Sequence, residues 1–109
     1  MTTERGDLLR GTLEMLILRS LEEGPMHGYG ITERLLSVSP EFLSVDEGSL
    51  YPALYRMQKR GWVTSRWGKS ENNRKARFYS LTNVGQAHLE KAADTWVKFS
   101  DAVSRAMAT

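Results

Sequence analysis

The segment of residues 46–61, DEGSLYPALYRMQKRG, restricts the possible folds more than any other part of the chain. Leu50, Leu54 and Met57 recur at helical spacing, which places three apolar side chains on one stripe of a helix. The opposite face and its flanks are mostly polar and carry Ser49, Tyr51, Pro52, Tyr55, Arg56 and Lys59. A helix with a narrow apolar back and a front of hydroxyls and cations suits insertion into the major groove of DNA.

An ordinary surface helix would also place Arg56 and Lys59 opposite its apolar stripe. The neighbouring hydroxyls of Ser49 and Tyr51 favour contact with phosphates or bases, because a purely solubilising face would use Glu and Lys. For Tyr55 we weigh contact with DNA equally against packing on the following strands or on the first helix.

Basic side chains are concentrated in the part of the chain that begins within this helix. Residues 56–77 contain eight Lys or Arg and one Glu, whereas residues 1–55 contain four basic and nine acidic side chains. Residues 78–109 contain three of each. A block of one charge sign is typical of a phosphate-binding surface, and its position directly after the polar helix favours this interpretation over a solvated face with no partner.

Apolar spacing and turn residues predict the other elements. We expect helices over residues 8–21, 27–38 and 46–60, strands over 62–67 and 75–81 around a polar turn at 68–74, and a last helix from Thr82 to about Met107. This order predicts a mainly α fold with a small β-hairpin: a winged helix-turn-helix domain over residues 1–82 and a C-terminal dimerisation helix over residues 83–109.

Several residues should determine the local geometry. Glycines are poor helix formers, so Gly28 and Gly30 in the first turn of the second helix predict close approach by another backbone or by a ligand. Pro52 removes one backbone hydrogen bond and should kink or loosen the first turn of its helix. Either Ser44, in a capping box with Glu47, or Asp46 should cap that helix.

The burial of other side chains follows from the same patterns. In the second helix, Ile31, Leu35 and Val38 should face inward, and Val63, Tyr79 and Leu81 should join the core from the strands. We expect Phe78 to face outward or toward the last helix, and Trp62 to cover the core.

The last helix carries a heptad pattern. Leu89, Trp96 and Val103 are spaced by seven residues, and Ala92, Phe99 and Ala106 follow at the second apolar position. Such a repeat predicts a seam between two copies of the chain, and the alternative is a helix folded back on its own domain. The apolar surface of the first helix is wider than one core contact needs, so Leu8 and Met15 are expected to join this seam.

Trp96 could serve the seam in two ways. It could pack against its symmetry mate, which we favour, or it could line a slot for a flat apolar ligand, to which Trp67 could contribute.

Other classes of function are excluded or disfavoured. With 109 residues the chain fits one small domain, and no apolar run approaches the roughly 18 residues of a membrane span. The N-terminus lacks the apolar core of a signal peptide, so we expect a cytoplasmic protein. The absence of cysteine excludes disulfides and thiolate metal sites. We find no catalytic motif or metal-ligand spacing and expect no cofactor and no enzymatic activity.

The sequence resembles the PadR family of bacterial transcriptional regulators, particularly its short members. The matching motifs are LLRGTLEMLILRSLEEGPMHGYGI at residues 8–31, GSLYPALYRMQKRGWV at 48–63 and NNRKARFYSLTNVGQAHL at 72–89. The resemblance covers nearly the whole chain, and the GSLYPAL segment is quite specific. It implies a homodimer that represses promoters by binding operator DNA. It also implies that small aromatic compounds release the protein from the DNA. The chain stops after a single C-terminal helix, unlike longer members, so we expect less surface for an effector domain.

The resemblance also implies roles for individual residues. Ser49, Tyr51 and Pro52 correspond to the start of the family's recognition helix. The HGY motif at His27, Gly28 and Tyr29 implies a site for a backbone phosphate, and Arg74, Lys75 and Arg77 match the basic stretch before the second wing strand.

The main hypothesis is therefore a dimeric repressor that reads a pseudo-palindromic operator. The predicted DNA-binding residues are Ser49, Tyr51, Pro52, Tyr55, Arg56, Lys59, Tyr29, His27, Lys69, Arg74, Lys75 and Arg77. The predicted seam, where a small aromatic effector could bind, comprises Leu8, Met15, Leu89, Trp96, Phe99 and Val103. One alternative is a winged-helix module whose basic face binds an acidic protein. Another is a small-molecule-binding protein with only vestigial DNA contact.

Overall fold

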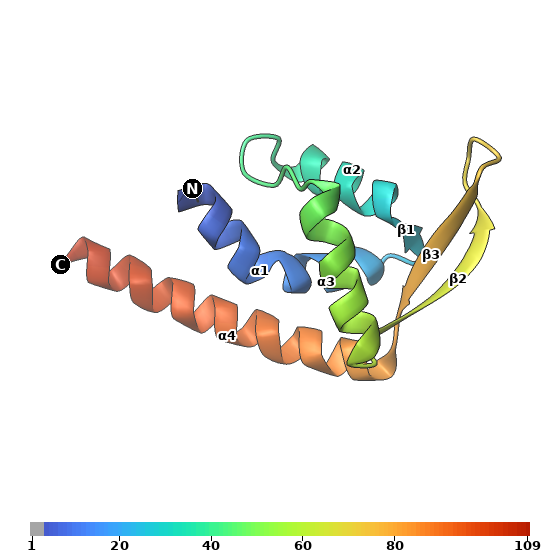
Figure 1. The fold of residues 1–109 in the computed structure, drawn as a ribbon. Coiled ribbons are helices and arrows are strands. Elements are labelled where there is room, and N and C mark those ends of the chain that lie inside the picture. Colours follow the sequence, from blue (N-terminus) through green and yellow to red (C-terminus); the bar gives the residue numbers. More distant parts are fainter. Residues whose placement is uncertain (1–3) are drawn as a thin grey trace.

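Residues 4–109 are described by a computed structural model, in which three helices and a small sheet form one group and a long last helix extends past it (Figure 1). The elements are α1 (Glu4–Leu21), β1 (Met26–His27), α2 (Gly28–Val38), α3 (Glu47–Lys59), β2 (Val63–Lys69), β3 (Lys75–Leu81) and α4 (Asn83–Ala108). Residues 1–3 of the predicted first domain lie outside the described residues. The molecule measures 54 × 30 × 24 Å, and α4 runs along its length (Figure 1).

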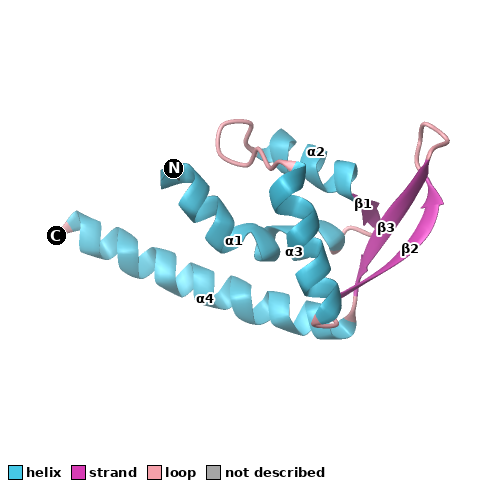
Figure 2. Cartoon of the chain, viewed as in Figure 1, coloured by secondary structure: helices cyan, strands magenta, loops and turns pink. Residues whose placement is uncertain are grey.

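The sheet has three antiparallel strands in the order β1-β3-β2. Figure 2 shows the sheet at one end of the helical group, with the turn between β2 and β3 projecting away from it. The hairpin was predicted from the sequence, but β1 was not, because a strand of two residues has no periodicity. Met26 pairs with Tyr79 and His27 with Phe78, so β1 fixes the wing to the start of α2.

The predicted core is largely confirmed. Ile31 and Leu35 of α2, Val63 of β2 and Tyr79 of β3 are at most 6% exposed, and Leu81 packs against the same cluster. The prediction for Val38 is wrong: its side chain is 64% exposed, because α2 ends at this residue.

Both ends of α3 are determined by local chemistry. The Asp46 carboxylate accepts a hydrogen bond from the Ser49 backbone N–H at 2.8 Å, so Asp46 and not Ser44 is the N-cap. Gly61, at φ 79°, closes the helix with hydrogen bonds from its own N–H to the Gln58 carbonyl and from the Trp62 N–H to Met57. The helix continues through Pro52, so the predicted loosening of its first turn does not interrupt it.

The start of α4 is anchored to the turn between α3 and β2. The Thr82 hydroxyl accepts a hydrogen bond from the Gly85 N–H at 3.0 Å and donates to the Gly61 carbonyl at 2.6 Å. Gly85 lies so close to this turn that a Cβ on it would be 2.1 Å from the Trp62 carbonyl oxygen. Trp62 stacks on the ring of His88 with 3.8 Å between centroids.

The prediction that Leu89 lies on the seam between two copies of the chain is wrong. Leu89 is 4% exposed and belongs to the core cluster of its own domain, so it does not lie on an intermolecular seam. The heptad pattern places Leu89 and Trp96 on one face of α4, but Leu89 is buried in the core whereas Trp96 is 44% exposed.

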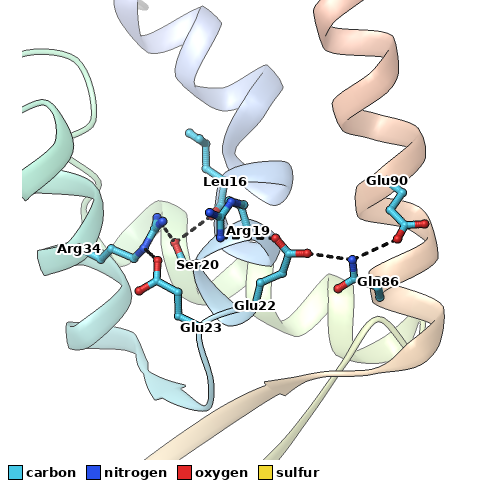
Figure 3. Close-up of polar contacts among 8 residues, drawn as sticks. All are labelled: Leu16, Arg19, Ser20, Glu22, Glu23, Arg34, Gln86 and Glu90. Carbon is cyan, nitrogen blue, oxygen red and sulfur yellow. Dashed lines mark hydrogen bonds and ion pairs between the residues drawn. The ribbon is translucent and has the colours of Figure 1, made fainter.

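Two sets of polar contacts connect α2 and α4 to the C-terminal end of α1 (Figure 3). The Arg34 guanidinium of α2 donates to the buried Ser20 hydroxyl at 3.1 Å and forms an ion pair with Glu23. The Gln86 amide of α4 donates to Glu22 at 2.8 Å. These contacts hold α2 and α4 at set positions against the same end of α1.

Candidate nucleic-acid interface

The exposed face of α3 is the first part of the candidate interface. Its apolar back is fully packed, since Leu50, Leu54 and Met57 are at most 1% exposed. The predicted contact residues are all exposed, and they are Ser49, Tyr51, Pro52, Tyr55, Arg56 and Lys59. Tyr55 is 64% exposed, so it is not buried against the wing or α1, and the Lys59 ammonium lies 5.3 Å from its ring centroid. The helix therefore presents phenols and cations to solvent over a rigid base.

Tyr51 lies where α3 meets the start of α2. Its ring covers Gly28, and a Cβ on Gly28 would lie 2.4 Å from the Tyr51 hydroxyl oxygen. The close approach predicted for this glycine is therefore made by a side chain, and not by a backbone. Partial burial, with a smaller effect of the Glu47 charge, raises the pKa of Tyr51 above its ordinary value of 10.0. The phenol is thus protonated at neutral pH and can donate to a phosphate oxygen.

A groove of about 990 Å³ runs between the start of α2 and the wing. Its walls include seven of the predicted DNA-binding residues: His27, Tyr29, Tyr51, Lys69, Arg74, Lys75 and Arg77. These residues come from three separate parts of the sequence, and the fold brings them together because β1 pairs with β3 beside the start of α2. A groove with cations on one wall and phenols on the other has the charge and the hydrogen-bond donors that a phosphate backbone requires.

The wall formed by α2 is shaped by His27. Its Nδ1 accepts a hydrogen bond from the Gly30 N–H at 2.9 Å and caps the helix, which leaves the ring beside Phe78 at 5.2 Å between centroids. Phe78 therefore packs near α2 and not toward the last helix, which was one of the predicted directions. Tyr29 is 67% exposed, and a hydrogen bond to Glu33 raises the pKa of its hydroxyl.

The wall formed by the wing contains a tryptophan whose place the sequence did not reveal. Trp67 is 58% exposed and is the cross-strand partner of Arg77. The Lys75 ammonium and the Arg77 guanidinium lie 5.0 and 5.2 Å from its ring centroid. Trp67 lines this groove and not the hollow beside Trp96, so the predicted contribution to the seam is wrong. The signal in the sequence that could have indicated this place is that Trp67 lies opposite a basic residue in the register of the hairpin.

The predicted seam residues other than Leu89 lie on α1 and on the distal part of α4. Leu8, Trp96, Phe99 and Val103 are 44–69% exposed, and Met15 is partly buried. Met15, Trp96 and Phe99 line a second, shallower hollow of about 450 Å³ between α1 and α4. Apolar side chains of this size are therefore left open to solvent on one side of the described chain.

The part of the chain that the structure describes contains no group of three or more His, Cys, Asp or Glu side chains arranged to hold a metal ion. Among residues 4–109, no helix is long and apolar enough to cross a membrane.

Comparison with known proteins agrees with this geometry. Residues 17–91 match the profile of the "Transcriptional regulator PadR-like family". A PadR-like transcriptional regulator from Bacillus cereus is 31% identical and superposes with a TM-score of 0.80 over 93% of this chain and 96% of that one. A transcriptional regulator from Clostridium thermocellum is 25% identical, with a TM-score of 0.82 over 91% and 96%.

A further similar protein has been solved with DNA. The structure of Bacillus subtilis PadR in complex with operator DNA is 27% identical and superposes with a TM-score of 0.66 over 74% of this chain. The match covers 46% of that chain, so the similarity spans less than half of the Bacillus subtilis protein. The curated sequence of that protein is described as a negative transcriptional regulator.

Proposed function

The chain belongs to the PadR-like family of transcriptional regulators, and from this premise we propose that it represses transcription by binding a pseudo-palindromic operator as a homodimer. Members of the family are transcriptional regulators and not enzymes. The observation that carries the proposal is the groove between the start of α2 and the wing, where seven predicted DNA-binding side chains from β1, α2, α3 and the wing converge.

In the proposed complex, the front of α3 enters a major groove and the wing contacts flanking phosphates. Ser49, Tyr51 and Tyr55 reach base edges or nearby phosphates through their hydroxyls. Lys75 and Arg77 neutralise the backbone, and the Trp67 ring between them restricts their motion. Repression, and not activation, is supported by the description of the Bacillus subtilis relative.

Dimerisation is proposed through Leu8, Met15, Trp96, Phe99 and Val103. Residues 1–82 then act as the DNA-binding domain and residues 83–109 as the dimerisation helix, whose first turns also complete the core of that domain. A two-fold dimer of this kind requires half-sites about one helical turn apart, ~34 Å. A small aromatic effector bound beside Trp96 would change the angle between the two DNA-binding domains and so release the operator.

The proposal is tested by fluorescence anisotropy with the DNA upstream of the protein's own gene and a scrambled duplex, each at two salt concentrations. We expect a preference for the upstream DNA of about a hundredfold or more, within the usual range for specific binding. Equal, salt-sensitive binding to both duplexes would place the operator elsewhere. No binding to either at low salt would contradict the proposal and favour a module that binds an acidic protein.

Substitutions in the wing test which surface is used. Lys75→Ala and Arg77→Ala should weaken binding to both duplexes and reduce the log–log salt slope by about 0.9 for each lost phosphate contact. Lys98→Ala on α4 removes the same charge far from the groove and serves as the control. If the wing variants and the control behave alike, the assigned surface is wrong.

A further inference from the structure

One carboxylate on α1 binds two arginines of α3. Glu14 Oε2 lies 3.2 Å from Arg56 Nε, and Glu14 Oε1 lies 3.2 Å from Arg60 Nη1. The Glu14 side chain is 27% exposed, whereas those of the two arginines are 51% and 49% exposed. The acid therefore lies partly beneath the two guanidinium groups, which remain open to solvent on their outer sides.

This pairing distinguishes the two arginines from the rest of the basic segment. Within residues 4–109, the other six cations of residues 56–77 have no carboxylate within ion-pair distance. They are Lys59, Arg66, Lys69, Arg74, Lys75 and Arg77. Among the described ion pairs, Glu14 is thus the acid that neutralises part of the candidate interface.

A carboxylate and a phosphate compete for the same guanidinium donors. Arginine binds both through paired N–H groups, so a donor held by Glu14 is not available to the DNA backbone at the same time. Arg56 lies on the exposed front of α3, and Arg60 follows it one helical turn later. The charge of Glu14 beneath them also opposes the approach of a phosphate.

The residues around the Glu14 ion pairs contact α4. The next residue, Met15, lines the hollow between these helices. On the other side, the Arg60 guanidinium lies 5.0 Å from the centroid of the Trp62 ring, which stacks on His88 of α4. A shift of α1 relative to α3 and α4 would therefore change the distance from Glu14 to both arginines.

We propose that Glu14 is a positioning residue that withholds Arg56 and Arg60 from DNA and thereby limits the affinity of the recognition helix for phosphate. This inference rests on the proposed DNA binding. The competing interpretation is a purely structural connection between α1 and α3, in which Glu14 contributes to stability and has no effect on phosphate contacts.

The test compares wild type with Glu14→Gln, which keeps the shape of the side chain and removes its charge. Anisotropy is measured with a fluorescein-labelled duplex of mixed sequence, long enough for two half-sites, between about 50 and 200 mM KCl. We expect Glu14→Gln to bind about tenfold more tightly at the lower salt concentration and to have a log–log salt slope steeper by about one to two, because each new phosphate contact adds about 0.9.

Two further variants isolate the cause. Asp94→Asn removes the same charge from an exposed ion pair with Lys98 on α4 and should leave the salt slope unchanged. Arg56→Gln in the Glu14→Gln background should return the slope toward that of wild type by about 0.9. A structural connection alone would lower the unfolding temperature of Glu14→Gln and leave the slope as it is.

The outcomes separate the two proposals. If wild-type protein binds the duplex and Glu14→Gln has an unchanged or shallower slope, the inference about Glu14 is overturned while DNA binding stands. If the log–log salt slope of Asp94→Asn becomes steeper by the same amount, the inference about Glu14 is overturned as well, because the effect would then depend on the net charge of the protein. Wild-type protein that does not bind the duplex at low salt overturns the proposed function and this inference together.

Discussion

The contact between Gly28 and Tyr51 shows how one backbone position directs a side chain at the candidate interface. Gly28 is buried at the start of α2, and the missing Cβ leaves the space that the Tyr51 hydroxyl occupies. Tyr51 is nevertheless 43% exposed and lines the groove. The glycine therefore determines where the phenol can donate a hydrogen bond.

Gly28→Ala should redirect Tyr51 without unfolding the domain. The new Cβ meets the far end of a side chain that can rotate away, so we expect the free energy of unfolding to change by less than about 1 kcal/mol. The preference for operator over scrambled DNA should fall about tenfold, equivalent to ~1.4 kcal/mol. Urea unfolding and anisotropy measure the two effects.

Gly30→Ala is the matched control for this prediction. Its Cβ would lie 3.4 Å from the His27 ring and would not touch Tyr51. If both alanine variants lose the same preference, the effect belongs to the turn as a whole and the role assigned to Gly28 is wrong.

At the scale of single residues, the sequence predicted which side chains belong to the candidate interface but not which of them contact one another. The HGY motif and the basic stretch indicated His27, Tyr29 and the wing cations, and the fold brings them to one groove. Glu14 and Trp67 were missed for a physical reason. Each acts through a neighbour that is distant in sequence, and helical or strand periodicity carries no information on such pairs.

At the scale of secondary structure, the junction between the wing and α4 depends on close backbone packing. Thr82 caps α4 and donates to the carbonyl of Gly61, and Gly85 lies against the carbonyl of Trp62. The turn after α3 and the first turn of α4 therefore meet through the Thr82 hydroxyl and close backbone packing. This junction sets the direction in which α4 leaves the winged-helix domain.

Gly85→Ala should be destabilising, although alanine is normally the better helix residue. Its Cβ would overlap a backbone carbonyl that cannot rotate away, so we expect a loss of about 1–3 kcal/mol in the free energy of unfolding. Gly11→Ala in α1 is the control, because no atom lies within 4 Å of its Cβ position. The free energy of unfolding of that variant, measured by urea unfolding, should rise by up to about 1 kcal/mol. A Gly85→Ala protein as stable as wild type would contradict the close packing.

The elements that the sequence predicted well are those with strong end signals. Strand β3 begins and ends at the predicted residues, and α4 begins after its predicted cap at Thr82. Helix α1 begins at Glu4, earlier than the predicted Leu8, because residues 4–7 continue the helix without adding to its apolar stripe. Strand β1 exists only through its pairing with β3, so no local pattern indicated it.

At the scale of the whole molecule, the distal part of α4 has little contact with its own domain. Beyond Leu89, no residue of this helix is buried, and Trp96, Val97, Phe99, Val103 and Met107 are 44–81% exposed. Trp96, Phe99 and Val103 keep the heptad spacing, which favours a second copy of the chain as the covering partner.

Phe99→Glu should convert the proposed dimer into a monomer. Two carboxylates facing each other across a two-fold seam would repel and would lose their hydration, and sedimentation velocity would report the smaller species. Val97→Glu is the control, because Val97 is 64% exposed but lies off the heptad stripe. If both variants sediment as wild type does, the seam is elsewhere.

The burial of Leu89 has a consequence for the way the protein is made. A ribosome delivers the chain from its N-terminus at about 5–20 residues per second, so α1, α2 and α3 emerge before the residue that completes their core. Until the first turns of α4 leave the exit tunnel, the apolar faces around Ile17, Ile31 and Leu54 lack one of their covering side chains. During that interval the core of the domain is incompletely covered, so the burial of Leu89 is one of the last steps that complete it.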